Sequence, residues 1–216
     1  MICNVDFLIA GLVILLLVLW YFLGQKRAED LNNQVFFFFA VVGSLDLLTE
    51  LFSNYLIISA KGHYGIAAVL GTSAFYLFQA GLPFAFICYI QTLYKNRIVS
   101  VKRILLSGLP TFVLISIVLT NPFTEKLFYF EVPEGYMRGP WYMLMYYSAL
   151  GHMVVALILI ISWRKELGHQ KVKILLEILV ISGAGVVIQL LYHSLLTTGF
   201  GLSLGILALF ITINNP

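Results

Sequence analysis

Seven stretches of the sequence are apolar over about the length that a helix needs to cross a bilayer. A hydrocarbon core about 30 Å thick requires about 20 helical residues, and lipid cannot satisfy the backbone of an open sheet or irregular loop. The chain is 61% hydrophobic and 11% charged, whereas soluble domains have about 25% charged residues. We therefore expect an all-α integral membrane protein, a seven-transmembrane helix bundle, with helices at approximately 5–24, 35–60, 66–94, 104–120, 141–163, 172–196 and 200–213.

The basic residues are divided unequally between the two sets of loops. Ten Lys and Arg residues follow the first, third and fifth expected helices, and three follow the second and fourth. Cytoplasmic loops carry the excess of Lys and Arg, so the split predicts an N-terminus outside and a C-terminus in the cytoplasm. The net charge of +3 therefore reports orientation, and we expect no nucleic acid partner. Residues 1–6 lack the basic start of a signal peptide, so we expect the first helix to be retained.

Segment 121–140 is the long loop of the predicted topology, and we expect it outside. Turn-forming residues alternate there with aromatic side chains between Phe123 and Tyr136. This mixture favours a folded segment over a flexible linker. We expect the segment to act as an extracellular lid over a pocket.

Asp46 and Glu50 lie well inside the second expected helix. Their spacing places both carboxyl groups on one helical face, which Asn54 continues toward the outside. An acidic residue at this depth costs about 2.5–3.5 kcal/mol on insertion scales, which makes each a candidate for function. Two such groups so close together should share a proton or require a cation. The alternative is a protonated pair that bonds to neighbouring helices for structure alone.

The third expected helix carries a polar stripe formed by Thr72, Tyr76, Gln79 and Pro83. Proline can kink a helix and free a backbone carbonyl group, and we expect Gln79 near the bilayer midplane. For each of these residues the alternative is an ordinary interhelical hydrogen bond, worth about 0.6 kcal/mol.

The fifth expected helix begins with four aromatic residues that predict an interfacial belt: Trp141, Tyr142, Tyr146 and Tyr147. Deeper in this helix, Ser148 and His152 share a face. A contact between His152 and Asp46 would make a proton-sensitive switch. The alternative is a packing histidine whose hydrogen bonds are satisfied by its neighbours.

The sixth expected helix places small and polar residues on roughly one face, which suits a cavity open to the outside: Ser182, Gly185, Gln189, Tyr192 and His193. Glu177 follows Lys173 by one turn near the cytoplasmic boundary. This spacing predicts an interfacial ion pair, so we exclude Glu177 from the candidate site.

Sequence motifs for catalysis are absent. The chain has no HExxH, GxSxG or Walker-type phosphate loop, and no second histidine stands at metal-ligand spacing from the first. The last expected helix has no lysine for a Schiff base. We therefore expect no enzyme activity within these residues, and no metal or other cofactor.

The Tyr136-Met137-Arg138-Gly139-Pro140 stretch before the fifth helix, together with Asp46, the seven helices and the outer N-terminus, resembles a bacterial family. It is similar to the seven-transmembrane sensor module at the N-terminus of membrane histidine kinases and diguanylate cyclases. The resemblance implies a receptor in the bacterial cytoplasmic (inner) membrane. Such a module binds a small molecule from outside or from the membrane lipid, and signals through its last helix to a cytoplasmic output domain. It also implies a homodimer formed through the full-length chain.

The seventh expected helix is short, and the sequence stops at Pro216 without a charged flank. We therefore expect the polypeptide to continue into an output domain. Two other functions stay open: a small proton-coupled transporter that uses Asp46 and Glu50 with Pro83 as a hinge, and a structural subunit.

For the receptor, a basic or polyhydroxylated small molecule would suit the two carboxyl groups. The candidate ligand-binding residues are Asp46, Glu50, Tyr76, Gln79, Arg138, His152, Gln189 and His193.

Overall fold

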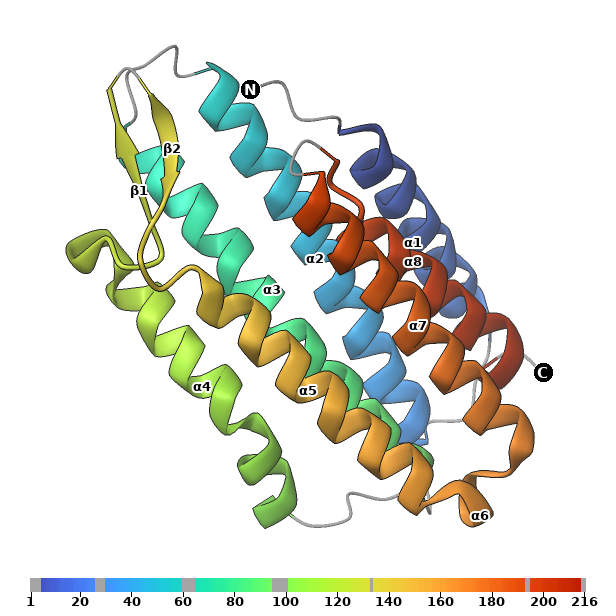
Figure 1. The fold of residues 1–216 in the computed structure, drawn as a ribbon. Helices are drawn as coiled ribbons and strands as arrows, with labels where there is room; N and C mark the ends of the chain where they lie inside the picture. Colours follow the sequence, from blue (N-terminus) through green and yellow to red (C-terminus); the bar gives the residue numbers. More distant parts are fainter. Residues whose placement is uncertain are drawn as a thin grey trace.

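The computed structural model describes residues 5–25, 30–59, 65–94, 101–132, 134–192 and 195–214. Figure 1 shows the long helices side by side in one bundle, with a two-stranded hairpin at one end and the short helix α6 at the other. The elements in chain order are α1 (Asp6–Gly24), α2 (Leu31–Ser59), α3 (Ile66–Leu93), α4 (Val101–Thr124), β1 (Phe128–Glu131), β2 (Gly135–Arg138), α5 (Met143–Ser162), α6 (Arg164–Leu167), α7 (His169–Leu191), α8 (Thr198–Leu209) and the π-helical turn η1 (Phe210–Asn214).

Six helices of the described chain are long and apolar enough to cross a membrane: α1, α2, α3, α4, α5 and α7. Large apolar side chains on their outer faces are more than half exposed, among them Leu16, Leu106 and Val180. An apolar surface of this extent marks contact with lipid. The chain is therefore a multi-pass helical membrane protein, as composition predicts.

The seventh apolar helix, Thr198–Ile213, combines α8 with most of η1 and is shorter than the other six. At 1.5 Å per residue it reaches about 24 Å, less than the roughly 30 Å of a hydrocarbon core. Thr197 precedes it, and its side chain donates a 3.0 Å hydrogen bond to the carbonyl group of Gly185 on α7. The ends of α7 and α8 are thus joined.

Several helix ends differ from the sequence-based boundaries because polar side chains extend the helices. α2 begins at Leu31 and not at 35, since the Asp30 carboxylate accepts the Asn33 backbone N–H at 2.8 Å in the manner of an N-cap. α4 continues to Thr124 and not to 120. Its last turn includes Asn121, whose side chain accepts the Leu127 N–H at 2.7 Å. Hydropathy alone does not register such caps.

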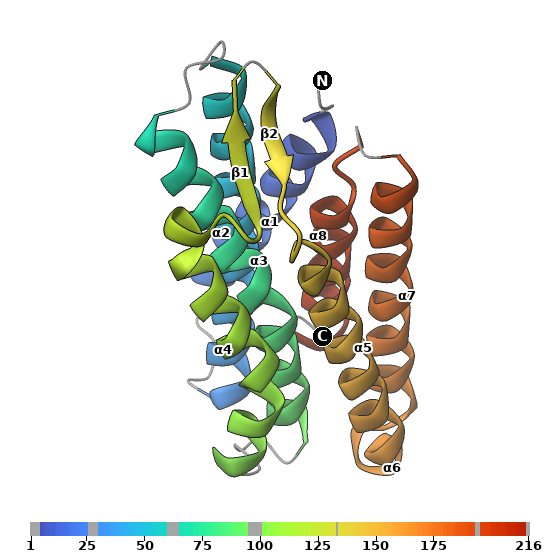
Figure 2. The ribbon, with the colours of Figure 1, turned by 60° about the vertical axis from the view of Figure 1, so that its left-hand side comes forward.

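α8 packs among α1, α2 and α7, and two glycines permit its close approach. A Cβ atom at Gly199 would lie 2.3 Å from Leu47 Cδ2 of α2, and one at Gly205 would lie 2.9 Å from Ile178 Cγ2 of α7. Small residues at such interfaces allow helices in lipid to pack by van der Waals contact. Figure 2 shows α8 on the α5–α7 side of the bundle, across from α3 and α4.

We expect Gly199→Ala to destabilise the bundle, because the added methyl group must displace Leu47. Overpacking of this kind costs about 1–3 kcal/mol. The matched control is Gly151→Ala in α5, where a Cβ atom would meet nothing within 4 Å and helix propensity favours alanine by up to about 1 kcal/mol. The measurement is thermal unfolding in detergent followed by circular dichroism. Equal midpoints for the two variants would contradict the packing assigned to α8.

Candidate ligand-binding site

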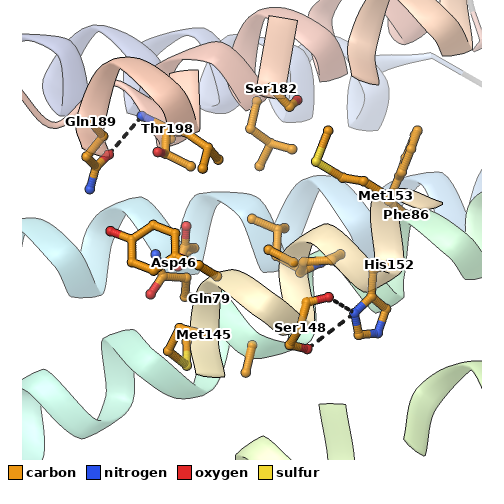
Figure 3. Close-up of a pocket in the computed structure, with 18 of the residues that line it drawn as sticks. Asp46, Gln79, Phe86, Met145, Ser148, His152, Met153, Ser182, Gln189 and Thr198 are labelled. Carbon is orange, nitrogen blue, oxygen red and sulfur yellow. Dashed lines mark hydrogen bonds between the residues drawn. The ribbon is translucent and has the colours of Figure 1, made fainter. Parts of the chain in front are cut away.

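A cavity of about 130 Å³ lies between α2 and α3 on one side and α5, α7 and α8 on the other. For comparison, an engineered apolar cavity of about 150 Å³ binds benzene. Figure 3 shows the side chains that point into it from these helices. The structure brings together six of the eight candidate residues in its lining: Asp46, Glu50, Tyr76, Gln79, His152 and Gln189.

Asp46 and Glu50 occupy successive turns of α2 and are 4% and 6% exposed. Asp46 Oδ1 is buried and has no hydrogen-bond partner. Within the described ranges, neither carboxyl group forms an ion pair with a basic side chain. The ion pair found there is the predicted one between Lys173 and Glu177, at 3.8 Å on the exterior of the bundle. A buried charge without a partner is strongly unfavourable. The pair must therefore hold a proton or meet a cation or donor in the cavity.

The position of α2 against α3 is fixed one turn beyond Glu50. Ser53 Oγ and Thr72 Oγ1 share a buried hydrogen bond of 2.8 Å between the two helices. Pro83 lies inside α3 and lines the cavity together with Gln79. Because Pro83 has no N–H, the backbone carbonyl group of Gln79 lacks its usual helical donor. Gln79 and Asp46 both line the cavity (Figure 3), so α3 and α2 present polar groups to the same space.

Tyrosine side chains close the cavity at the hairpin end. The hydroxyl groups of Tyr76 and Tyr136 are hydrogen-bonded, which joins α3 to β2. The hydroxyl groups of Tyr142 and Tyr146 are 3.1 Å apart, and the rings of Tyr76 and Tyr142 meet edge to face with centroids 6.4 Å apart. Tyr76, Tyr142 and Tyr146 line the cavity. Tyr136 lies behind them and ties this wall to the hairpin.

Arg138 does not line the cavity, in contrast to the prediction. Its guanidinium carbon lies 4.4 Å from the centroid of the Tyr142 ring, a distance at which a cation and an aromatic face attract each other. The side chain belongs to a strand of the hairpin, which the sequence pattern could not orient. Arg138 therefore contacts the lining residue Tyr142 without lining the cavity itself.

Segment 121–140 folds mainly as a β-hairpin, in which β1 pairs antiparallel with β2 and Phe128 faces Arg138. Gly139 follows β2 where the chain passes very close to itself. A Cβ atom at this position would lie 2.3 Å from the carbonyl oxygen of Lys126. Glycine is therefore required in the stretch on which the family resemblance rests.

His152 is 2% exposed, and both of its ring nitrogens have partners. Nδ1 lies 2.7 Å from the carbonyl oxygen of Ser148, and Nε2 lies 3.0 Å from Thr111 Oγ1 of α4. No ring nitrogen is left for Asp46, so the contact that would make a proton-sensitive switch is not formed. The alternative, a histidine satisfied by its neighbours, is the arrangement found, although the ring still lines the cavity.

Gln189 lies on the wall of the cavity opposite Asp46 (Figure 3). Its Oε1 accepts the backbone N–H of Thr198 at 3.1 Å, which satisfies the first amide of α8. The residue thus connects the cavity to the start of α8. His193 lies outside the described residues.

The sequence-based interpretation missed Tyr142 and Tyr146, which it assigned with their neighbours to an interfacial belt. Trp141 and Tyr147 do face outward and are 46% and 63% exposed. The missed signal is a helical spacing: Tyr142, Tyr146 and Ala149 recur at intervals of four and three residues and share one inward face.

Comparison of the chain with known protein families, with curated proteins and with solved structures found no match. Among the residues that the structure describes, no group of three His, Cys, Asp or Glu side chains could hold a metal ion. The chemistry of the site therefore has to be argued from its own side chains.

We expect Tyr136 to make the stability of the hairpin end depend on pH. Burial raises the pKa of Tyr136 to about 12, from about 10 for an exposed tyrosine. Between about pH 10 and 12 the unfolded state therefore binds fewer protons than the folded state, so the free energy of unfolding falls as pH rises.

Thermal unfolding across this pH range measures the effect. Tyr136→Phe should reduce the decline. The same decline in Tyr136→Phe as in the wild type would show that Tyr136 is not the group responsible.

Proposed function

We propose that the chain is a seven-transmembrane sensory module that binds a small molecule in the cavity and transmits a conformational signal through α8. By the resemblance of its sequence, the output domain is a cytoplasmic histidine kinase or diguanylate cyclase, and the full-length chain forms a homodimer in the bacterial cytoplasmic membrane. The observation that carries the proposal is the position of α8, since Thr198, Gly199 and Leu202 line the cavity. The helix that leads toward the C-terminus thus begins at the ligand site.

A ligand in this cavity would touch both walls that position α8. Gln189 holds the first amide of α8, and Gly199 packs directly on Leu47, the neighbour of Asp46 in sequence. A ligand transmits a signal only if it binds one arrangement of α8 better than the other, by about 1.4 kcal/mol for each tenfold shift in the equilibrium. Contacts to both walls supply such a difference.

A line of packed aromatic rings offers a second connection from the cavity to η1. Phe86 lines the cavity and packs on Phe39 with centroids 5.6 Å apart. Phe39 stacks on Tyr89 at 6.3 Å, and Tyr89 packs on Phe36 at 5.7 Å. Phe36 in turn stacks on Phe210 of η1 at 6.2 Å. Since π-helical turns occur frequently at functional sites, η1 is a reasonable place for the signal to leave the bundle.

The charge distribution supports the proposed orientation. α6 contains Arg164 and Lys165, and it lies at the opposite end of the bundle from the hairpin (Figure 1). The excess of basic residues follows the odd-numbered helices of the predicted topology, so this end faces the cytoplasm by the positive-inside rule. The hairpin and the tyrosine wall of the cavity then face outside.

The alternative, a proton-coupled transporter, draws support from the unpartnered oxygen of Asp46. Pro83 inside α3 would provide its hinge. In this case the cavity must open alternately to both sides. In the described residues, a layer of packed aromatic side chains, the aromatic floor, blocks one of these openings. It is formed by Phe36, Phe39 and Tyr89, each fully buried. We therefore place the receptor first.

Filling the cavity covalently tests the receptor without knowledge of its ligand. Ser182 lines the cavity and its buried Oγ has no partner, so Ser182→Cys, with both native cysteines replaced by serine, can be labelled with benzyl methanethiosulfonate. We expect amide hydrogen exchange in α8 and η1 to change about tenfold, the response to a shift of about 1.4 kcal/mol in local opening.

The matched control is Ile158→Cys on the outer face of α5, which is 57% exposed. Intact mass shows that both variants carry the label. Unchanged exchange in α8 and η1 after complete labelling at position 182 would contradict the receptor.

The output half of the proposal is tested by the coding sequence beyond codon 216. We expect it to encode a kinase or cyclase domain. A stop codon directly after this position would contradict signalling through a fused output domain and would favour the transporter.

A further inference from the structure

We propose that the cavity recognises an organic amine with an apolar body, and not a polyol or an anion. The protonated amino group meets Asp46 and Glu50, and the apolar body lies between α5 and α7. This inference rests on the proposed function of the cavity as a ligand site.

The charge of the lining selects a cation. Two carboxyl groups face the cavity, and no Lys or Arg stands among its lining in the described chain. His152 cannot serve an anion, because Ser148 and Thr111 occupy its ring nitrogens. Asp46 Oδ1 is a buried acceptor that lacks a donor. An ammonium group supplies both the donor and the compensating charge.

Aromatic rings in the same lining strengthen this preference. Tyr76, Tyr142 and Tyr146 line the cavity together with the two carboxyl groups, and a tyrosine face attracts a cation within about 6 Å. Arg138 already uses this interaction, with its guanidinium group 4.4 Å from the ring centroid of Tyr142. An inorganic cation would use the rings poorly, since hard cations require several oxygen ligands.

The remaining lining argues against a polyol. Most of the wall away from the carboxyl groups is formed by apolar side chains, including Met145, Met153, Ile178, Val186 and Leu202, and its polar members include Ser182 and Gln189. A hydroxyl group placed against such a wall loses its hydrogen bonds to water without replacement, at about 1–3 kcal/mol on mutational evidence. An alkyl or aryl group loses nothing there. The methionines add an adaptable surface that suits an aromatic or alkyl body.

The probes are phenethylamine and hexylamine, each with its alcohol and carboxylate analogue of matched chain. We expect both amines to raise the unfolding midpoint of the detergent-solubilised protein, with apparent affinity at least about tenfold above the analogues, about 1.4 kcal/mol in binding free energy. The amines should also slow thiol labelling of Ser182→Cys, which locates them in the cavity.

Asp46→Asn and Glu50→Gln should each weaken amine binding about tenfold or more, since both remove a negative charge without changing side-chain size. The matched control is Glu177→Gln, which removes a carboxylate from the exterior pair and should bind amines as the wild type does. Unfolding midpoints without ligand show that each variant is folded. Should one carboxyl variant fail to fold, the other carries the comparison.

Any of three results would overturn the proposed amine ligand. These are alcohols or carboxylates that bind as well as the amines, amine binding unchanged in both carboxyl variants, and failure of all amines to protect Ser182→Cys. The proposed receptor function would survive these results, because the exchange of α8 after covalent filling tests that function separately.

Discussion

Helices in lipid gain little from burying apolar side chains against one another, because the lipid tails are equally apolar. The bundle therefore depends on close backbone approach and on polar contacts between helices. Gly199 and Gly205 bring α8 against α2 and α7, and a hydrogen bond between Ser53 and Thr72 joins α2 to α3. These contacts act only at short range and between particular atoms. A small displacement of α8 therefore breaks its present contacts before new contacts can form.

The same constraint makes Asp46 and Glu50 costly to insert, and their surroundings favour a functional role over a purely structural one. A structural carboxyl pair would be expected to bond to neighbouring helices, as Ser53 and Thr111 do. Asp46 Oδ1 instead has no partner, and both side chains line a cavity. The free energy lost on inserting them is recovered only when something enters that cavity or a proton is held there. An unpartnered acceptor in a cavity that is also lined by tyrosine rings is a more specific arrangement than a proton site requires.

Hydropathy predicted the existence of the helices, and the spacing of Asp46 and Glu50 predicted their common face. Hydropathy did not indicate that Tyr146 turns inward and its neighbour Tyr147 outward, although the helical spacing of Tyr142, Tyr146 and Ala149 carries that signal. The partner of His152 was hidden, since Thr111 comes from α4 and a sequence does not state which helices meet. Helix ends lie away from the predicted boundaries where capping side chains such as Asp30 act. The glycines of α8 were a readable signal of close packing that hydropathy ignored.

The aromatic floor beneath the cavity favours the proposed receptor over the transporter on physical grounds. Alternating access requires a gap to open on each side of the cavity in turn, and in the proposed orientation Phe36, Phe39 and Tyr89 fill the cytoplasmic side with fully buried rings. Opening it would separate several ring pairs, each worth about 0.5–1.5 kcal/mol beyond burial. For a receptor the same rings are useful while packed, because Phe36 contacts Phe210 of η1 and packed groups shift between discrete arrangements instead of deforming gradually. A rigid floor opposes transport, and it favours transmission to the end of α8.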